Sequence, residues 1–135
     1  MNDPEAFHDT NIVLYLLSSD PVKADCAEAL LAAGGRISVQ VLNEFVAVAT
    51  RKFGMSWSEI GEILSIVRAV CRVEPLTVET HDRARLIAER YRFGFYDALI
   101  VATALLSGCT VLYSEDLQAG QKIDSQLTVV NPFQL

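Results

Sequence analysis

The sequence predicts an α/β protein in which helices cover both faces of a mostly parallel β-sheet. Short β-type runs alternate with helical runs, and no internal repeat or linker interrupts them. Helical stretches between strands imply crossover connections, which join parallel strands. With 135 residues, 51% of them hydrophobic, the chain has the size of one domain with a substantial core. We therefore expect residues 1–135 to form a single domain, a three-layer α/β/α sandwich with five strands at residues 6–9, 36–39, 73–76, 110–113 and 127–130.

Capping residues and glycines set the expected helix ends. Asp20 and Pro21 form an N-cap and a first-turn proline. The segment from Ser56 to Glu59 is a capping box that opens another helix. Glycines follow most of the helical runs and are typical of helix ends. We expect helices from residue 21 to Gly34, from about 40 to Gly54, from 57 to about 70, from 79 to 92 and from 96 to 107.

The charge balance bears on the possible partners. The chain has 11 Lys and Arg against 17 Asp and Glu, a net charge of −6, which weakens a nucleic-acid role because such proteins usually present a basic surface. Without the four acids described next, the remainder is nearly balanced. Bound divalent cations would cancel much of the local negative field, so a nucleic-acid role is not excluded.

Cellular location is suggested by the absence of membrane and export signals. No apolar run approaches the ~20 residues of a membrane-spanning helix, and residues 1–5 lack the basic, apolar start of a signal peptide. The widely spaced Cys26, Cys71 and Cys109 fit buried thiols in a reducing compartment. We expect a cytoplasmic protein without membrane attachment.

Four carboxylates stand where the surrounding pattern does not favour a charge. Asp9 ends the first strand, Glu44 interrupts an apolar helical run, Asp97 opens the most hydrophobic helix, and Asp116 follows the fourth strand. Together they are the acidic quartet. Strand ends and helix starts are where α/β proteins bind ligands. Carboxylates near a core are costly unless they are protonated, hydrogen-bonded or bound to a cation. If the quartet converges, it forms a hard-cation site, and mutual repulsion would raise carboxylate pKa values without metal.

Two members of the quartet have competing structural explanations. Asp9 is either the N-cap of a helix or a metal ligand that Thr10 or Asn11 orients. Glu44 shares a helical stripe with Arg51, so it either faces solvent as an ion-pair partner of that arginine or joins the site.

The other two are better placed for a site. Asp97 is a possible helix-stabilising charge, but no polar residue follows it for five positions, so its helix is expected to be buried on most sides. A buried helix start is a poor place for an idle charge. Strand alternation puts Glu115 and Asp116 on opposite sides, and we expect Asp116 to be the ligand and Glu115 a supporting residue.

A second cluster, of arginines, lies on one predicted helix. Arg83 and Arg90 are seven residues apart, as are Arg85 and Arg92, so each pair shares a helix face. The cluster is either a solvated face with Glu89 as ion-pair partner or a patch that contacts RNA phosphates.

Walker A, G-x-G-x-x-G and G-x-S-x-G motifs are absent from the sequence. Four segments, in order and spacing, instead resemble the PIN domain family, particularly the VapC-type toxins of bacterial toxin–antitoxin pairs. They are F-H-D-T-N-I at residues 7–12, the helix that carries Glu44, Y-D-A-L-I-V-A-T-A at residues 96–104 and L-Y-S-E-D-L at residues 112–117. The resemblance covers essentially the whole chain. It implies a metal site at the acidic quartet, support from Asn11 and Ser114, and a five-stranded parallel sheet between helices.

The resemblance also implies an activity and partners. The activity is that of an endoribonuclease with Mg²⁺ or Mn²⁺ as cofactor, in which metal-activated water hydrolyses RNA phosphodiester bonds. The partners are an antitoxin whose tail blocks the acidic groove and a second copy of the toxin in a homodimer. Phe53, Met55 and Trp57 are candidate contact residues, or alternatively pack into the local core. Two other functions stay open: a housekeeping RNA-processing nuclease without antitoxin, and a non-catalytic metal-binding module.

Overall fold

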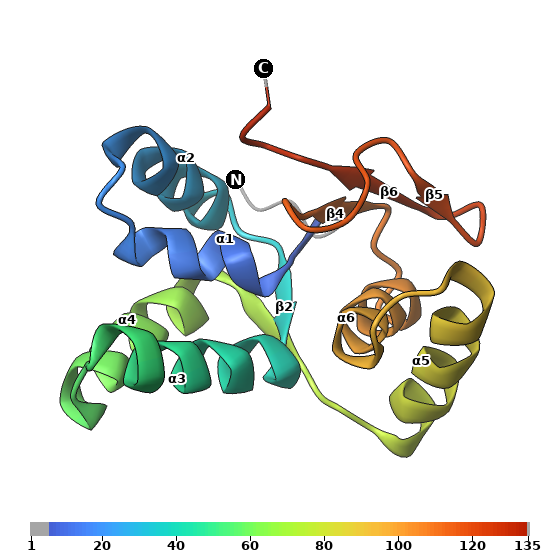
Figure 1. Cartoon of the computed structure of the whole chain (residues 1–135), viewed down its shortest axis with the longest axis horizontal. Helices are drawn as coiled ribbons and strands as arrows, with labels where there is room; N and C mark the ends of the chain where they lie inside the picture. Colours follow the sequence, from blue (N-terminus) through green and yellow to red (C-terminus); the bar gives the residue numbers. More distant parts are fainter. Residues whose placement is uncertain (1–5, 135) are drawn as a thin grey trace.

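The computed structural model describes residues 6–134. Its strands are β1 (Ala6–His8), β2 (Arg36–Ser38), β3 (Arg72–Glu74), β4 (Val111–Tyr113), β5 (Lys122–Ile123) and β6 (Leu127–Val130). Its helices are α1 (Thr10–Leu14), α2 (Pro21–Ala32), α3 (Val39–Phe53), α4 (Trp57–Val70), α5 (Val78–Tyr91) and α6 (Phe95–Leu106), with a short 3₁₀ helix η1 (Tyr15–Leu17). In Figure 1, α1 to α4 lie on the left, and α5 and α6 lie at the lower right, below β4, β6 and β5. The α/β/α architecture predicted from the sequence is confirmed.

The sheet is parallel except at one edge. Its strand order is β3-β2-β1-β4-β6-β5, and β1 pairs in parallel with both β2 and β4. Among the strands of residues 6–134, only β5 runs antiparallel, beside β6. All five expected strands are present among residues 6–134, and β5 is a sixth strand that we did not predict. Two residues are too few to show an alternating pattern. The turn from β5 into β6 places Asp124 and Ser125 at left-handed φ values of 51° and 56°.

Capping explains most of the helix boundaries. Asp20 caps α2 ahead of Pro21, and the capping box at the start of α4 is formed as expected. Gly54 ends α3 in the left-handed conformation, with φ of 59°. The pair α1 and η1 was not anticipated, because five helical residues carry too little periodicity to be recognised.

The core lies around the central strand and helix α6. Every residue of β1 is buried, and so is every residue of α6 from Ala98 to Leu105. The expectation of a helix buried on most sides behind Asp97 is therefore correct. Cys71 and Cys109 are buried and Cys26 is partly buried, and burial raises the pKa of Cys71 to about 11. Within residues 6–134, no helix is long and apolar enough to cross a membrane. The expectation about a signal peptide concerns residues 1–5, which lie outside the described part of the chain.

Candidate active site

The acidic quartet converges on one cavity of about 260 Å³, here called the acidic cavity. The parallel topology explains this, because β1 and β4 are neighbours and their carboxyl ends lie at the same edge of the sheet. Asp9 follows β1, Asp116 lies in the turn after β4, and α3 and α6 bring Glu44 and Asp97 to the same edge. Thr10, Asn11 and Arg51 also line the cavity.

Asp9 fills one of the two roles that the sequence offered as alternatives, that of an N-cap, and its role as a metal ligand stays a prediction. It is the N-cap of α1, where its Oδ1 accepts a hydrogen bond of 2.7 Å from the backbone N–H of Thr10. Its Oδ2 accepts a hydrogen bond of 2.7 Å from the hydroxyl of Ser114. The side chain is almost fully buried, yet it lines the acidic cavity. These two bonds hold the carboxylate in a fixed orientation at the cavity wall.

Ser114 links the two strand ends. Besides donating to Asp9, its oxygen accepts hydrogen bonds from the backbone N–H groups of Asp116 (3.2 Å) and Leu117 (3.3 Å). The side chain is fully buried. One hydroxyl therefore ties the turn after β4 to the carboxylate that follows β1.

Glu44 turns to the cavity instead of pairing with Arg51. Its carboxylate accepts a hydrogen bond from the hydroxyl of Thr10, and the side chain of Gln40 also hydrogen-bonds to it. Arg51 lines the same cavity, but no ion pair joins it to Glu44 in the described part of the chain. Thr10 therefore supports both Asp9, through its backbone, and Glu44, through its side chain.

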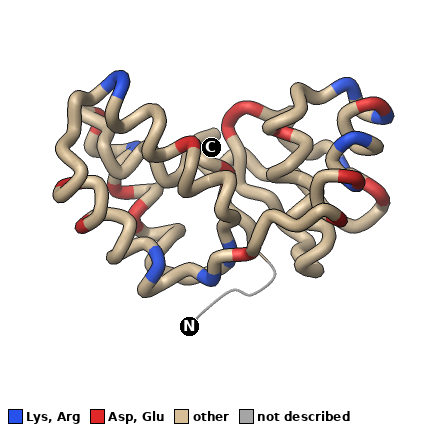
Figure 2. The backbone as a smooth tube through the Cα atoms, turned by 90° about the horizontal axis from the view of Figure 1, so that it is seen from below, with Lys and Arg blue, Asp and Glu red and all other residues tan. Residues whose placement is uncertain are grey.

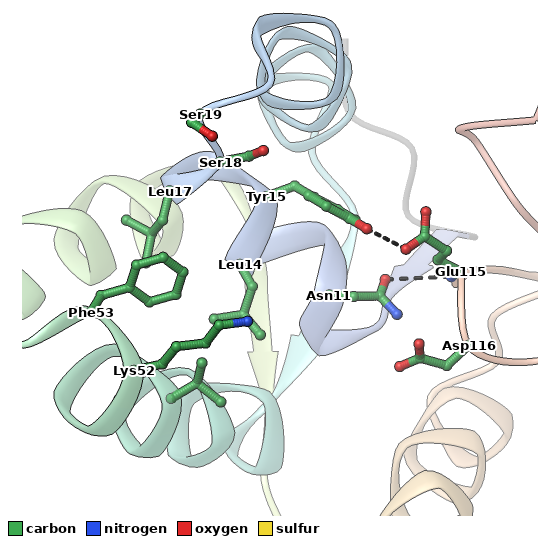
Figure 3. Close-up of a pocket in the computed structure, with 11 residues that line it drawn as sticks. Asn11, Leu14, Tyr15, Leu17, Ser18, Ser19, Lys52, Phe53, Glu115 and Asp116 are labelled. Atoms are coloured by element: carbon green, nitrogen blue, oxygen red, sulfur yellow. Dashed lines mark hydrogen bonds between the residues drawn. The ribbon is translucent and has the colours of Figure 1, made fainter.

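Glu115 and Asp116 face different surroundings, as strand alternation predicts. Glu115 accepts a hydrogen bond from the Tyr15 hydroxyl and forms an ion pair of 3.3 Å with Lys23. Figure 3 shows this pairing with Tyr15 and the separate direction of the Asp116 carboxylate. Asp116 lines the acidic cavity, whereas Glu115 does not. Asn11 accepts a weak hydrogen bond of 3.4 Å from the Glu115 backbone N–H.

We predict that Glu115→Gln reduces RNA cleavage less than Asp116→Asn does. Each change removes one negative charge, but only Asp116 lies in the acidic cavity, while Glu115 is held by Tyr15 and Lys23. Initial cleavage rates of the two variants, measured at equal Mg²⁺ concentration, test this. A lower rate for Glu115→Gln than for Asp116→Asn would show that Glu115, and not Asp116, is the metal ligand.

Three carboxylates of the quartet, those of Asp9, Glu44 and Asp97, are disfavoured as anions. Burial raises the pKa of Asp9 from 3.8 to about 7, even though the hydrogen bonds from Ser114 and Thr10 oppose the shift. Burial also raises the pKa of Glu44 and of Asp97, and repulsion from Asp116 adds to both. The sequence suggested mutual repulsion as the cause; burial is the larger one.

The donor set suits a hard divalent cation. All four side chains offer oxygen ligands, and no ion pair within residues 6–134 neutralises any of them. The Nδ2 of Asn11 is buried without a hydrogen-bond partner among the described residues, and Figure 3 shows it turned towards Asp116. Within residues 6–134, no three acidic, histidine or cysteine side chains lie close enough together to coordinate one ion directly. Mg²⁺ and Mn²⁺ sites tolerate this spacing, because these ions keep several water ligands and need only one or two carboxylates each.

The arginine cluster on α5 is largely engaged within the protein. Arg83 and Arg90 pair with Asp124 at 3.1 and 3.5 Å, and Arg85 pairs with Asp82 at 3.2 Å. The prediction that Glu89 is the ion-pair partner is wrong. The partner of Arg83 and Arg90 is Asp124, which lies in the β5–β6 turn, a turn that we did not predict from the sequence. Figure 2 shows basic and acidic residues interleaved at this end of the molecule, on the right. Contact of the cluster with RNA stays a prediction.

A second cavity, of about 540 Å³, adjoins the acidic one and is here called the adjoining cavity. The two share Asn11, Leu14, Val48 and Asp116 as lining residues. Its other walls include Tyr15 and Leu17 of η1 and Lys52 and Phe53 of α3, drawn in Figure 3. Sequence reasoning did not single out Tyr15, Lys23 or Lys52, and no local motif marks them.

The three residues proposed from sequence as partner contacts differ in exposure. Phe53 and Trp57 are 44% and 72% exposed, so local core packing is not their role. Met55 is partly buried and packs against the core. Phe53 and Trp57 therefore remain available as contact residues.

Comparison with known families agrees with this architecture. The family model described as the PIN domain matches residues 6–122, which include the whole acidic quartet. The chain therefore belongs to the PIN domain family. No curated protein matches the sequence significantly.

Solved structures of toxin–antitoxin proteins share the fold. A toxin–antitoxin complex from Klebsiella pneumoniae matches with a TM-score of 0.70 and 22% identity, over 96% of this chain and 99% of that chain. A VapC toxin from Mycobacterium tuberculosis that cleaves the sarcin–ricin loop matches with a TM-score of 0.68 and 24% identity, over 82% and 89%. A VapBC complex from Rickettsia felis bound to promoter DNA matches with a TM-score of 0.66 and 20% identity, over 92% and 96%. At these identities the likeness establishes a common fold.

Proposed function

We propose that this chain is a divalent-metal-dependent endoribonuclease that acts as the toxin of a toxin–antitoxin pair, within a single domain of residues 1–135. The observation that carries the proposal is the convergence of the acidic quartet on one cavity of a PIN domain. Membership of this family implies nuclease chemistry, and the oxygen-only donor set favours Mg²⁺ or Mn²⁺. A cytoplasmic location accords with RNA as the substrate.

Each residue of the site has a defined role in this proposal. The acidic quartet holds the cation, Ser114 and the Thr10 backbone fix the orientation of Asp9, and the Thr10 hydroxyl fixes Glu44. The bound cation supplies charge stabilisation at the phosphoryl group and lowers the pKa of water. Asn11, whose Nδ2 has no partner among the described residues, is placed to donate a hydrogen bond within the site. Burial of Asp9 strengthens its attraction for the cation, because charges interact more strongly away from bulk water.

The proposed partners are RNA, an antitoxin and a second copy of the chain. Support for an antitoxin comes from the neighbours in Klebsiella pneumoniae and Rickettsia felis, both described as complexes of a toxin–antitoxin system. A housekeeping RNA-processing nuclease would need no antitoxin, and a non-catalytic module would bind the cation without cleaving RNA. The convergence of all four acids favours the enzyme over the module.

RNA cleavage in the presence of Mg²⁺ or Mn²⁺, compared with EDTA, tests the proposed activity. We expect cleavage only with metal, leaving 5′-phosphate and 3′-hydroxyl ends, because water is the nucleophile. Cleavage in EDTA, or products with 2′,3′-cyclic phosphate ends, would contradict it. Sequencing of the 5′ ends generated in cells that express the chain would then identify the target RNA.

Expression of this chain is expected to arrest bacterial growth, and co-expression of the small protein encoded beside it should restore growth. The inhibitor's tail should carry Arg or Lys, because a cation in the acidic cavity substitutes electrostatically for metal. Growth curves with the Asp97→Asn variant as the inactive control measure both effects. If the well-folded wild-type chain leaves growth unchanged, the housekeeping alternative is favoured.

A further inference from the structure

The adjoining cavity has no role in the site described so far. Its volume, about 540 Å³, falls within the roughly 300–1,000 Å³ of sites that bind small molecules and cofactors. It opens directly beside the acidic cavity, because Asn11 and Asp116 line both. Any group bound there therefore lies next to the carboxylates that hold the cation.

The walls of this cavity are suited to a flat, apolar group. Leu14, Leu17 and Val48 supply aliphatic surface. Phe53 closes one side and keeps 44% of its surface exposed. Figure 3 shows the Phe53 ring facing Leu17, with Lys52 reaching from α3 towards α1. An exposed aromatic ring beside aliphatic side chains is a surface on which a nucleobase stacks.

Two cations without an ion pair among the described residues stand at the two cavities, and the Nζ of Lys52 lies 5.8 Å from the centroid of the Phe53 ring. Arg51 lines the acidic cavity and Lys52 the adjoining one, and neither forms an ion pair with any residue between 6 and 134. Both are exposed and follow each other in the last turn of α3. Cations are usual in a last helical turn, where they stabilise the dipole. Stabilising the dipole does not by itself require Arg51 and Lys52 to line cavities. Their lack of ion pairs also contrasts with the α5 arginines, three of which pair with aspartates.

We propose that the adjoining cavity binds one nucleotide of single-stranded RNA next to the scissile phosphodiester. Phe53 stacks on the base, while Lys52 and Arg51 contact the phosphates on either side. Glu115 is paired with Lys23, and a cation bound at the acidic quartet would offset the quartet's charge, so Arg51 and Lys52 leave the last turn of α3 positive. With metal bound, this turn attracts a polyanion, whereas a basic inhibitor tail would enter the acidic cavity in place of the metal. The inference rests on the proposed ribonuclease function and names the path of its substrate over the last turn of α3.

Equilibrium binding of a labelled single-stranded RNA hexamer with non-cleavable methylenephosphonate linkages tests this, in the wild-type background with Mg²⁺. Lys52→Ala should weaken binding several-fold and reduce the slope of log K against log salt by about 0.7, the value for one phosphate contact on a single strand. Phe53→Leu, which keeps an apolar side chain but removes the ring, should weaken binding about fivefold or more without changing the slope. An abasic nucleotide at the stacked position should cause the same loss in the background protein and no further loss with Phe53→Leu.

Matched controls separate these effects from general ones. Lys122→Ala removes an exposed lysine of β5, and Trp57→Leu removes an exposed ring of α4; neither residue lines the two cavities. If Lys52→Ala and Phe53→Leu bind RNA like these controls, the inference is overturned. It is also overturned if the two variants lose only inhibition by the antitoxin, since the cavity then serves a protein.

The outcome for the proposed function is read independently. Metal-dependent cleavage by the wild type, with RNA binding unaffected by either variant, removes the nucleotide site and leaves the ribonuclease. A wild-type chain that neither binds nor cleaves RNA removes both.

Discussion

Asp9→Asn and Asp97→Asn are each expected to abolish RNA cleavage while leaving the fold intact. An amide is nearly the same shape as a carboxylate but is a far poorer ligand for a hard cation. The loss should exceed the roughly 10- to 100-fold typical of residues that only support a metal ligand. Initial rates at saturating Mg²⁺ measure it.

The control for this prediction is Glu115→Gln, which removes the same charge outside the acidic cavity. Asp9→Asn can still accept the hydrogen bond from the Thr10 backbone, so α1 keeps its cap. Circular dichroism and thermal unfolding verify that the fold is retained. Full activity in either asparagine variant would remove that residue from the site.

The metal-free protein is expected to lose stability as pH rises from about 4 to about 7. The pKa of Asp9 is raised from 3.8 to about 7 in the folded chain, mainly by burial. Below pH 4 this group is protonated in both states and its stabilising contribution is complete; above pH 7 the folded chain holds a buried anion and the contribution is lost. A shift of this size corresponds to at most about 4 kcal/mol. Glu44 and Asp97, whose pKa values are also raised, add in the same direction.

Paired acids elsewhere act at lower pH and do not hide this trend. Burial opposes ionisation of Asp124, but hydrogen bonds from Tyr91 and Arg83 lower its pKa overall. A lowered folded pKa contributes stability above the unfolded value and loses it as pH falls, so Asp124 acts below about pH 4. Asp124 therefore does not mask the loss of stability that we expect between pH 4 and 7 from Asp9, Glu44 and Asp97.

Above pH 7, bound metal should restore the stability that the metal-free protein loses between pH 4 and 7, because a ligand that binds only the folded state stabilises it. Asp9→Asn should accordingly be more stable than wild type in EDTA at pH 8, and should lose most of its thermal shift with Mn²⁺. Thermal unfolding in EDTA and in saturating Mn²⁺ measures both effects. If the wild type shows no Mn²⁺ shift and the variant gains nothing in EDTA, the carboxylates do not act as one site.

Local chemistry was enough to predict most of the fold. The capping box at Ser56, the proline start of α2 and the glycine end of α3 determine their boundaries through hydrogen bonds to neighbouring backbone. Where the signal is short, as in α1 or β5, tertiary packing decides the structure. The two-residue strand β5 is defined by its antiparallel pairing with β6 and not by a pattern of its own.

The acidic quartet was predictable for a different reason. In a parallel sheet, residues just after the carboxyl ends of the strands lie at one edge, so the strand assignment favoured convergence of the quartet without establishing it. The partners of Glu115 could not be found in this way, since Tyr15 and Lys23 lie about a hundred residues earlier and contact it only in the folded chain. The same holds for Asp124 beside the α5 arginines, and for Lys52 and Phe53 beside the site. These contacts depend on tertiary structure and carry no motif.

Direct titration of Mn²⁺, followed by electron paramagnetic resonance of the free ion, is the most direct test that the acidic quartet forms one metal site. We predict saturable binding by the wild type and by Glu115→Gln, and binding that is greatly weakened by Asp9→Asn and by Asp97→Asn. Equal Mn²⁺ affinity in the wild type and in both asparagine variants would show that the bound ion lies elsewhere and would contradict the account.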